Sequence, residues 1–206
     1  ALFLLIIGFK SVTQIPLHKW KYVAITAMFG TFIPAYLFAI AQTQINSSVS
    51  SILNSLTPLN TLILGALVFG LDFKRTQIFG VIVGLVGTML LIFNGAVNNP
   101  GQNYWYTILG LIASVCYATN VNLIKKYLSD MKPLTITTGN FLVMLVPAFC
   151  ILLFTDFFSV IHFEKVKHSM LFVALLGIVG TGIANVLFYK LIQISSPVFA
   201  TSVTYL

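Results

Sequence analysis

The stretch INSSVSSILNSLTPLNTLILGALVFG, residues 45–70, is long and apolar enough to cross a bilayer, yet its first half is rich in serine and asparagine. Pro58 interrupts it near the middle, and it contains no charged residue. On a helix its polar residues recur at spacings of three and four, so they form one stripe. Because unpaired polar groups are costly in lipid, we expect the stripe to face protein or a water-filled cavity. The stripe consists of Ser47, Ser50, Ser51, Asn54, Thr57 and Thr61.

The composition of the chain indicates a membrane protein. Of the 206 residues, 58% are hydrophobic and only 7% are charged, whereas soluble domains have roughly a quarter charged residues. The net charge of +7 comes from scattered Lys and Arg with no basic stripe, which argues against a nucleic-acid partner and fits membrane-topology signals. Cys116 and Cys150 both lie in apolar runs, so we interpret them as small core residues, with no disulfide and no metal site.

Short runs of polar residues divide the chain into apolar segments of about 20 residues, the length of a membrane-spanning helix. The fold class that this predicts is all-α, a polytopic transmembrane bundle of six complete and two partial helices. We expect the chain to be a portion of a larger protein, because an apolar run stands at each end. The complete spans are predicted at residues 20–41, 47–70, 76–94, 105–127, 134–154 and 170–193, the partial ones at 1–9 and from Pro197 onward, with a longer connection at 155–168.

The basic residues predict an orientation for this bundle. If alternate connections share a side, nine Lys and Arg fall on one side, and only Lys165 and Lys167 fall on the other. The positive-inside rule then makes the richer side cytoplasmic. The nine residues are Lys10, Lys19, Lys21, Lys74, Arg75, Lys125, Lys126, Lys132 and Lys190.

The two halves of the chain contain a weak internal repeat. HKWKYVAITAMFGT at 18–31 matches HSMLFVALLGIVGT at 168–181, and AQTQINSSVSSILNSLT at 41–57 matches KLIQISSPVFATSVTYL at 190–206. The matched spans lie five helices apart, so the two copies have opposite orientations in the membrane. Inverted repeats of this kind are typical of secondary transporters, whose substrate site lies near the bilayer midplane.

These features together resemble the EamA-like transporter family of the drug/metabolite transporter superfamily. The resemblance rests on Thr57-Pro58 within the polar helix, on the glycine-spaced helix with Gly80, Gly84 and Gly87, and on SSPVFATSVTYL as a second copy. The chain departs at Asp72, where the family more often has Glu. The resemblance implies ten helices in two inverted five-helix repeats with both termini cytoplasmic. Residues 1–94 would then be the end of the first repeat, helices 2 to 5, and residues 105–206 the start of the second, helices 6 to 9.

Polar residues inside the predicted spans are the candidates for a substrate cavity. For each of them a bond between packed helices is the alternative, since Ser, Thr and Asn also join helices in membranes. Two sets of small residues are expected to serve close packing: Gly80, Gly84 and Gly87, and Gly110, Ser114 and Ala118. The cavity candidates are Ser47, Ser51, Asn54, Thr57, Pro58, Tyr117, Asn120, Asn140, Asn185 and Tyr189.

The distribution of reactive side chains argues against an enzyme. All Asp, Glu and His residues fall in predicted loops or at helix ends, so no acid–base pair, metal site or cofactor site is expected within the membrane. We therefore predict an inner-membrane permease that exports a small neutral or zwitterionic metabolite, such as an amino acid, by alternating access. Its expected partners are this small-molecule substrate and the lipid bilayer, and the oligomeric state is left open. The alternative is a multi-helix receptor or scaffold without transport activity, which would not require the repeat.

Overall fold

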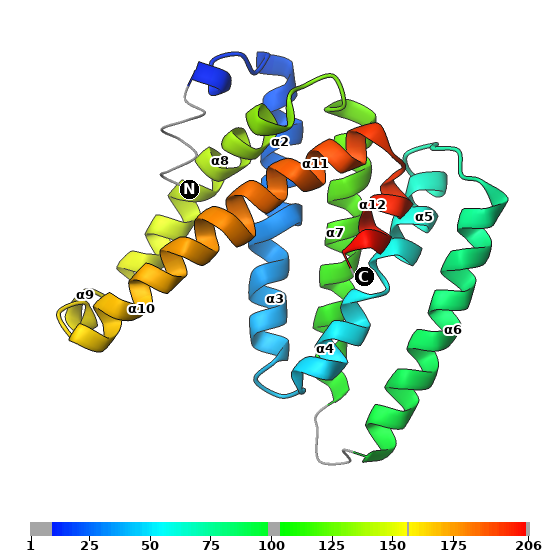
Figure 1. Cartoon of the computed structure of the whole chain (residues 1–206), viewed down its shortest axis with the longest axis horizontal. Coiled ribbons are helices and arrows are strands. Elements are labelled where there is room, and N and C mark those ends of the chain that lie inside the picture. Colours follow the sequence, from blue (N-terminus) through cyan, green and yellow to red (C-terminus); the bar gives the residue numbers. More distant parts are fainter. Residues whose placement is uncertain (1–9, 99–103, 156, 205–206) are drawn as a thin grey trace.

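The computed structural model describes residues 10–98, 104–155 and 157–204, and all regular elements in these ranges are helices (Figure 1). This confirms the predicted all-α, polytopic fold class. Within these ranges, four helices are long and apolar enough to cross a membrane: Leu17–Ala41, Thr107–Tyr127, Pro133–Leu153 and Glu164–Ile194. The predicted partial helix at residues 1–9 lies outside the described residues.

The elements follow one another in the order that the hydropathy predicts. In the first half they are η1 (Leu17–Lys19), α2 (Trp20–Ala27), η2 (Met28–Phe32), α3 (Ile33–Ala41), α4 (Ser47–Asn54), α5 (Thr57–Leu67) and α6 (Arg75–Asn98). In the second half they are η3 (Tyr104–Tyr106), α7 (Thr107–Tyr127), α8 (Pro133–Leu153), α9 (Phe157–Val160), α10 (Glu164–Leu175), η4 (Leu176–Ile183), α11 (Ala184–Ile194) and α12 (Pro197–Val203).

The polar span at 47–70 is two helices rather than one. α4 begins at Ser47, where the Asn46 side chain accepts a hydrogen bond from the Val49 amide at 2.9 Å, and it ends at Asn54. Pro58 has no N–H to donate to the Asn54 carbonyl, and its ring crowds that carbonyl, which interrupts the α-helical hydrogen bonding there. The Thr57 hydroxyl donates to the Asn54 carbonyl instead, at 2.7 Å. The sequence places an interruption at Pro58, and in the structure α4 already ends one turn earlier, at Asn54.

The connection predicted at 155–168 is wrong in its extent. α9 occupies part of it, and α10 already begins at Glu164. Two polar residues extend the helix beyond the apolar run: Glu164 lies in the first turn, where a negative charge is favourable, and it accepts a hydrogen bond from Lys167 at 2.8 Å.

α7 is the central helix of the described part, packing against α2, α3, α4, α5, α11 and α12. Small residues allow this, as predicted: a Cβ atom added at Gly110 would lie 2.8 Å from the Leu53 Cδ1 atom, and Ser114 and Ala118 are fully buried. Within the described part of the chain, the glycines of α6 show no such packing. Cβ atoms added at Gly80, Gly84 and Gly87 would meet no described atom within 4 Å.

Two of the spans contain a π-helical segment in their middle. η2 joins α2 to α3, and η4 joins α10 to α11. The shift of 150 residues that aligns the two sequence copies places η2 on residues 178–182, inside η4. π-helical segments are rare and occur often at functional sites, so their recurrence at matched positions is an independent sign of a repeated unit.

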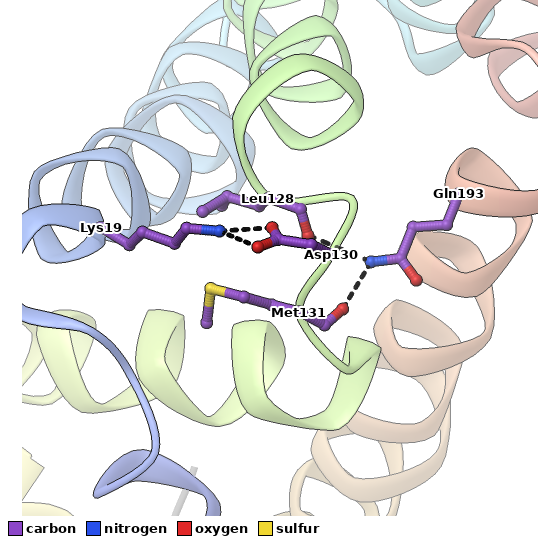
Figure 2. Close-up of polar contacts among 5 residues, drawn as sticks. All are labelled: Lys19, Leu128, Asp130, Met131 and Gln193. Atoms are coloured by element: carbon purple, nitrogen blue, oxygen red, sulfur yellow. Dashed lines mark hydrogen bonds and ion pairs between the residues drawn. The ribbon is translucent and has the colours of Figure 1, made fainter.

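Polar contacts join several helices at one end of the bundle. The start of α2, the α7–α8 connection and the end of α11 all lie at the upper end in Figure 1. There Lys19 forms an ion pair with Asp130, and the Gln193 amide donates to the carbonyls of Leu128 and Met131 at 3.3 and 2.8 Å (Figure 2). The Lys19 ammonium holds the pKa of the Asp130 carboxyl below its usual value, chiefly through this hydrogen bond.

Two lysines at the same end bond to backbone carbonyls. Lys126 donates to the Phe69 carbonyl at 2.6 Å, and Lys125 donates to three carbonyls at the end of α11, at distances of 2.6 to 3.2 Å. The last carbonyls of a helix lack partners within the helix, so a cation there is favourable. Lys125 and Lys126, which the sequence analysis used only to predict the orientation, therefore also join the ends of neighbouring helices.

Candidate functional site

A central cavity of about 360 Å³ lies among helices from both halves of the chain. η2, α4 and α5 contribute from the first half, and α7, α11 and α12 from the second. None of its lining residues is charged, and most carry an amide or a hydroxyl group. The lining residues are Gly30, Asn54, Thr57, Tyr117, Asn120, Val121, Ala184, Asn185, Phe188, Tyr189, Thr201 and Thr204.

Six of the ten predicted cavity residues line this space together. Asn54 and Thr57 come from the α4–α5 break, and the others come from α7 and α11. The predicted polar residues of four separate helices therefore meet at one place, as the cavity interpretation requires. These six are Asn54, Thr57, Tyr117, Asn120, Asn185 and Tyr189.

The remaining four candidates lie elsewhere. Ser47 and Ser51 are exposed, and the Ser51 hydroxyl donates to the Ser47 carbonyl of its own helix at 2.9 Å. Pro58 lines a second space of about 440 Å³ between α5, α6 and α12. Asn140 is buried among helices, so for this residue the alternative of a bond between packed helices holds.

A buried hydrogen-bonded chain supports one wall of the central cavity. The Thr26 hydroxyl donates to the Asn140 Oδ1 atom at 3.0 Å, and the Asn140 Nδ2 group donates to the Tyr189 hydroxyl, also at 3.0 Å. The Asn120 side chain interacts with the same tyrosine hydroxyl. The chain thus links α2, α8, α11 and α7, and it fixes the position of the one buried phenol that lines the cavity.

Three threonines of the cavity lining donate their hydroxyl protons to backbone carbonyls. The Thr57 hydroxyl donates to Asn54, the Thr201 hydroxyl to Pro197 and the Thr204 hydroxyl to Thr201, at 2.7, 3.0 and 2.7 Å. A hydroxyl has one proton to donate and two lone pairs that accept. These three groups are therefore acceptors toward anything that enters the cavity.

Gly30 lies directly against the Asn120 side chain at the cavity wall. A Cβ atom added at Gly30 would lie 2.5 Å from the Asn120 Nδ2 atom and 2.8 Å from its Oδ1 atom. Glycine is thus required for the π segment to approach α7 so closely. Asn120 is only 3% exposed, and its Oδ1 atom has no hydrogen-bond partner.

Sequence reasoning missed Gly30, Thr201 and Thr204. The repeat contained the signal for all three. Gly30 belongs to the Gly-Thr pair shared by the two copies, and the two threonines lie in the second copy of the polar helix. Among the described residues, no three or more His, Cys, Asp and Glu side chains are grouped so that they could hold a metal ion.

Comparison with known proteins places this architecture in a family. The model of the EamA-like transporter family matches residues 1–93 and 104–206. The chain belongs to the EamA-like transporter family. This EamA-like chain is 28% identical over 162 residues to solute carrier family 35 member F5 from Bos taurus, a match that covers 74% of the chain and 30% of that relative. No solved structure matches the chain at a significant level.

The family assignment and the exposed surface of the protein both indicate a membrane environment. As an EamA-like protein, the chain is an integral membrane protein of a transporter family. Its outward faces are correspondingly apolar: Leu171, Phe172 and Leu176 of the Glu164–Ile194 span are each about two-thirds exposed. Large apolar side chains exposed in a row along a helix are typical of a surface that faces lipid or neighbouring helices.

Proposed function

We propose that the protein transports a small neutral or zwitterionic solute, such as an amino acid, which binds in the central cavity. The observation that carries the proposal is that polar residues from both halves of the chain line one uncharged cavity. The proposed binding residues are Asn54, Thr57, Tyr117, Asn120, Asn185 and Tyr189.

The absence of charge from the lining selects the class of solute. A multiply charged solute would lose its hydration on entry and would find no fixed counter-charge to replace it. A neutral or zwitterionic solute needs only hydrogen bonds, which amides and hydroxyls supply in both directions. The volume of about 360 Å³ lies within the range of small-molecule sites.

The proposed mechanism is alternating access between two inverted repeats, residues 1–94 and 105–206. The matched π segments and the two segments of the family match support this division. We place the basic end in the cytoplasm, by the positive-inside rule, and the protein in the inner membrane, with outward transport.

Contacts between the proposed repeats at the basic end suggest that this conformation is closed to the cytoplasm. Lys19 of the first unit pairs with Asp130 of the second, and Lys126 bonds to the Phe69 carbonyl. In addition, the Gln77 amide donates to the Ser196 hydroxyl at 2.5 Å. Opening toward the cytoplasm would break all three contacts. The free energy of these contacts would therefore contribute to the cost of opening the cavity on that side.

Counterflow in proteoliposomes tests the proposal directly. Vesicles containing the purified protein and an unlabelled amino acid should accumulate the labelled form of the same amino acid, for at least one member of the set of L-amino acids. Asn54→Leu, which alters the cavity wall, should abolish most of this uptake. Ser51→Leu introduces the same side chain one turn away at an exposed position, so uptake should persist.

Two results would contradict the proposal. Uptake that Asn54→Leu leaves unchanged would remove this residue from the site. Absence of counterflow for every amino acid, with a correctly inserted protein, would favour the receptor or scaffold alternative. Size-exclusion chromatography in detergent confirms that each variant is inserted and folded before its flux is compared.

A further inference from the structure

The lining of the central cavity has an excess of hydrogen-bond acceptors on one side. The hydroxyl protons of Thr57, Thr201 and Thr204 are all donated to backbone carbonyls, so their oxygen atoms can only accept. α4 also ends at Asn54, which brings the negative end of a helix to the cavity wall. Among the described residues, no Lys or Arg side chain lines the cavity to balance these partial negative charges.

Asn120 adds an acceptor that lacks a partner. Three buried side-chain oxygens in the described part of the chain have none: those of Ser50, Asn120 and Asn122. Of these residues, only Asn120 lines the central cavity. Leaving a buried carbonyl oxygen unpaired is unfavourable, and nearly all such groups in folded proteins have a partner. In this conformation the oxygen is shielded against the η2 segment at Gly30, so a donor bound in the cavity can pair with it when the contact between η2 and α7 loosens.

We infer that Asn120, together with the three threonine oxygens, binds the ammonium group of the transported solute. An ammonium group carries three N–H donors, which suits a set of acceptors with no acidic residue among them. The cavity then distinguishes a primary amine from an analogue that keeps the positive charge but has no N–H. This inference rests on the proposed transport function and specifies the class of substrate for that site.

Gly30 is a positioning residue for this acceptor. Its missing side chain lets η2 lie against the Asn120 carboxamide, with only 2.8 Å between the position of an added Cβ and the Oδ1 atom. The unpaired oxygen is therefore held against the π segment of the first repeat while its own helix, α7, belongs to the second. The acceptor lies at the contact between the two units that alternating access would move.

Competition in proteoliposomes tests the inference. The probe is uptake of a labelled mixture of neutral L-amino acids, and the competitors are unlabelled L-leucine and N,N,N-trimethyl-L-leucine, which keeps the charge and lacks N–H donors. With the wild-type protein, L-leucine should compete at least about tenfold more effectively than the trimethyl compound, because a hydrogen bond to a charged donor is worth about 1.5 kcal/mol or more.

Variants of two asparagines on α7 distinguish a direct role of Asn120 in solute binding from a general effect of losing a buried asparagine. Asn120→Ala should reduce the preference for L-leucine to within about twofold. Asn122→Ala is the matched control: it removes a buried asparagine that bonds to the Thr61 carbonyl at 2.9 Å, yet leaves the cavity lining intact, so the preference should persist. If Asn120→Ala does not fold, Asn120→Asp keeps the size and the acceptors, and its preference for L-leucine should rise.

Each result decides between the possibilities. Equal competition by the two compounds in the wild type would overturn the inference, as would an unchanged preference in Asn120→Ala. An unchanged preference in Asn120→Asp would show that size alone excludes the trimethyl group. These failures leave the transport proposal standing, because uptake is still observed. Absence of amino-acid uptake would contradict the proposed function itself, and the inference with it.

Discussion

Gly30→Ala is the most informative single substitution, because the structure fixes what the new methyl group meets. The added Cβ would lie 2.5, 2.6 and 2.8 Å from the Nδ2, Cγ and Oδ1 atoms of Asn120. Ordinary contacts are about 3.5 Å or longer, so the carboxamide or the π segment must retreat by about 1 Å. Asn120 is 97% buried, which leaves it little room to do so.

The expected cost follows from two opposing terms. Overpacking of a buried site costs about 1–3 kcal/mol, while replacing a helical glycine by alanine returns up to about 1 kcal/mol. We therefore expect Gly30→Ala to destabilise the protein by about 1–2 kcal/mol and to weaken solute binding by about tenfold through the displaced Asn120. Gly80→Ala is the matched control, since its Cβ would meet no described atom within 4 Å.

Thermal denaturation in detergent and counterflow in proteoliposomes measure the two effects on the same preparations. Gly30→Ala should lower the midpoint of denaturation and the apparent affinity for the solute, while Gly80→Ala should leave uptake unchanged and stability equal or higher. If Gly30→Ala matches the wild type in both measurements, the close approach of η2 to Asn120 has no role in the site. If both alanine variants lose uptake equally, the effect belongs to membrane helices in general and not to this contact.

Three further predictions concern other parts of the structure. Asn140→Leu removes one of the two amide partners of the buried Tyr189 hydroxyl and an acceptor of the Thr26 hydroxyl, so it should destabilise the protein by about 1–3 kcal/mol in thermal denaturation. Asp130→Asn should lower stability at pH 7 by at most about 1 kcal/mol, because Asp130 is exposed. The folded-state pKa of Asp130 is lowered, so the ion pair stabilises above the unfolded pKa of about 3.9, and the difference between wild type and Asp130→Asn should vanish as the pH falls through the folded value. Thr57→Val removes the cavity-lining hydroxyl that donates to the Asn54 carbonyl and should reduce uptake in counterflow, whereas exposed Ser47→Val should not.

Hydropathy and the repeat were sufficient to predict the helical architecture and most of the candidate site. The helix pattern depends on the transfer of about 20 residues into lipid, a large and additive term that a sequence shows directly. The polar residues Asn54, Asn120 and Asn185 could be assigned to one cavity because isolated amides in apolar helices need a polar environment.

Details set by local geometry could not be predicted in the same way. The predicted single polar stripe is wrong: the helix ends at Asn54, Ser47 and Ser51 are exposed, and Ser50, Thr57 and Thr61 are buried. A glycine looks alike in sequence whether it contacts a neighbour, as Gly30 does, or faces open space, as Gly80 does. Which of the two applies depends on tertiary packing.

The central claim is that the cavity opens in turn to the two sides of the membrane while it holds the solute. In a variant with Cys116 and Cys150 replaced by alanine, Ala184→Cys places one thiol in the cavity lining at a position outside the proposed binding residues. Its labelling by a membrane-impermeant maleimide, applied to either side of oriented vesicles, is the decisive measurement. We expect labelling from both sides, and we expect the transported amino acid to slow it from each. Labelling from one side only, or labelling that the amino acid leaves unchanged, would contradict alternating access around this cavity.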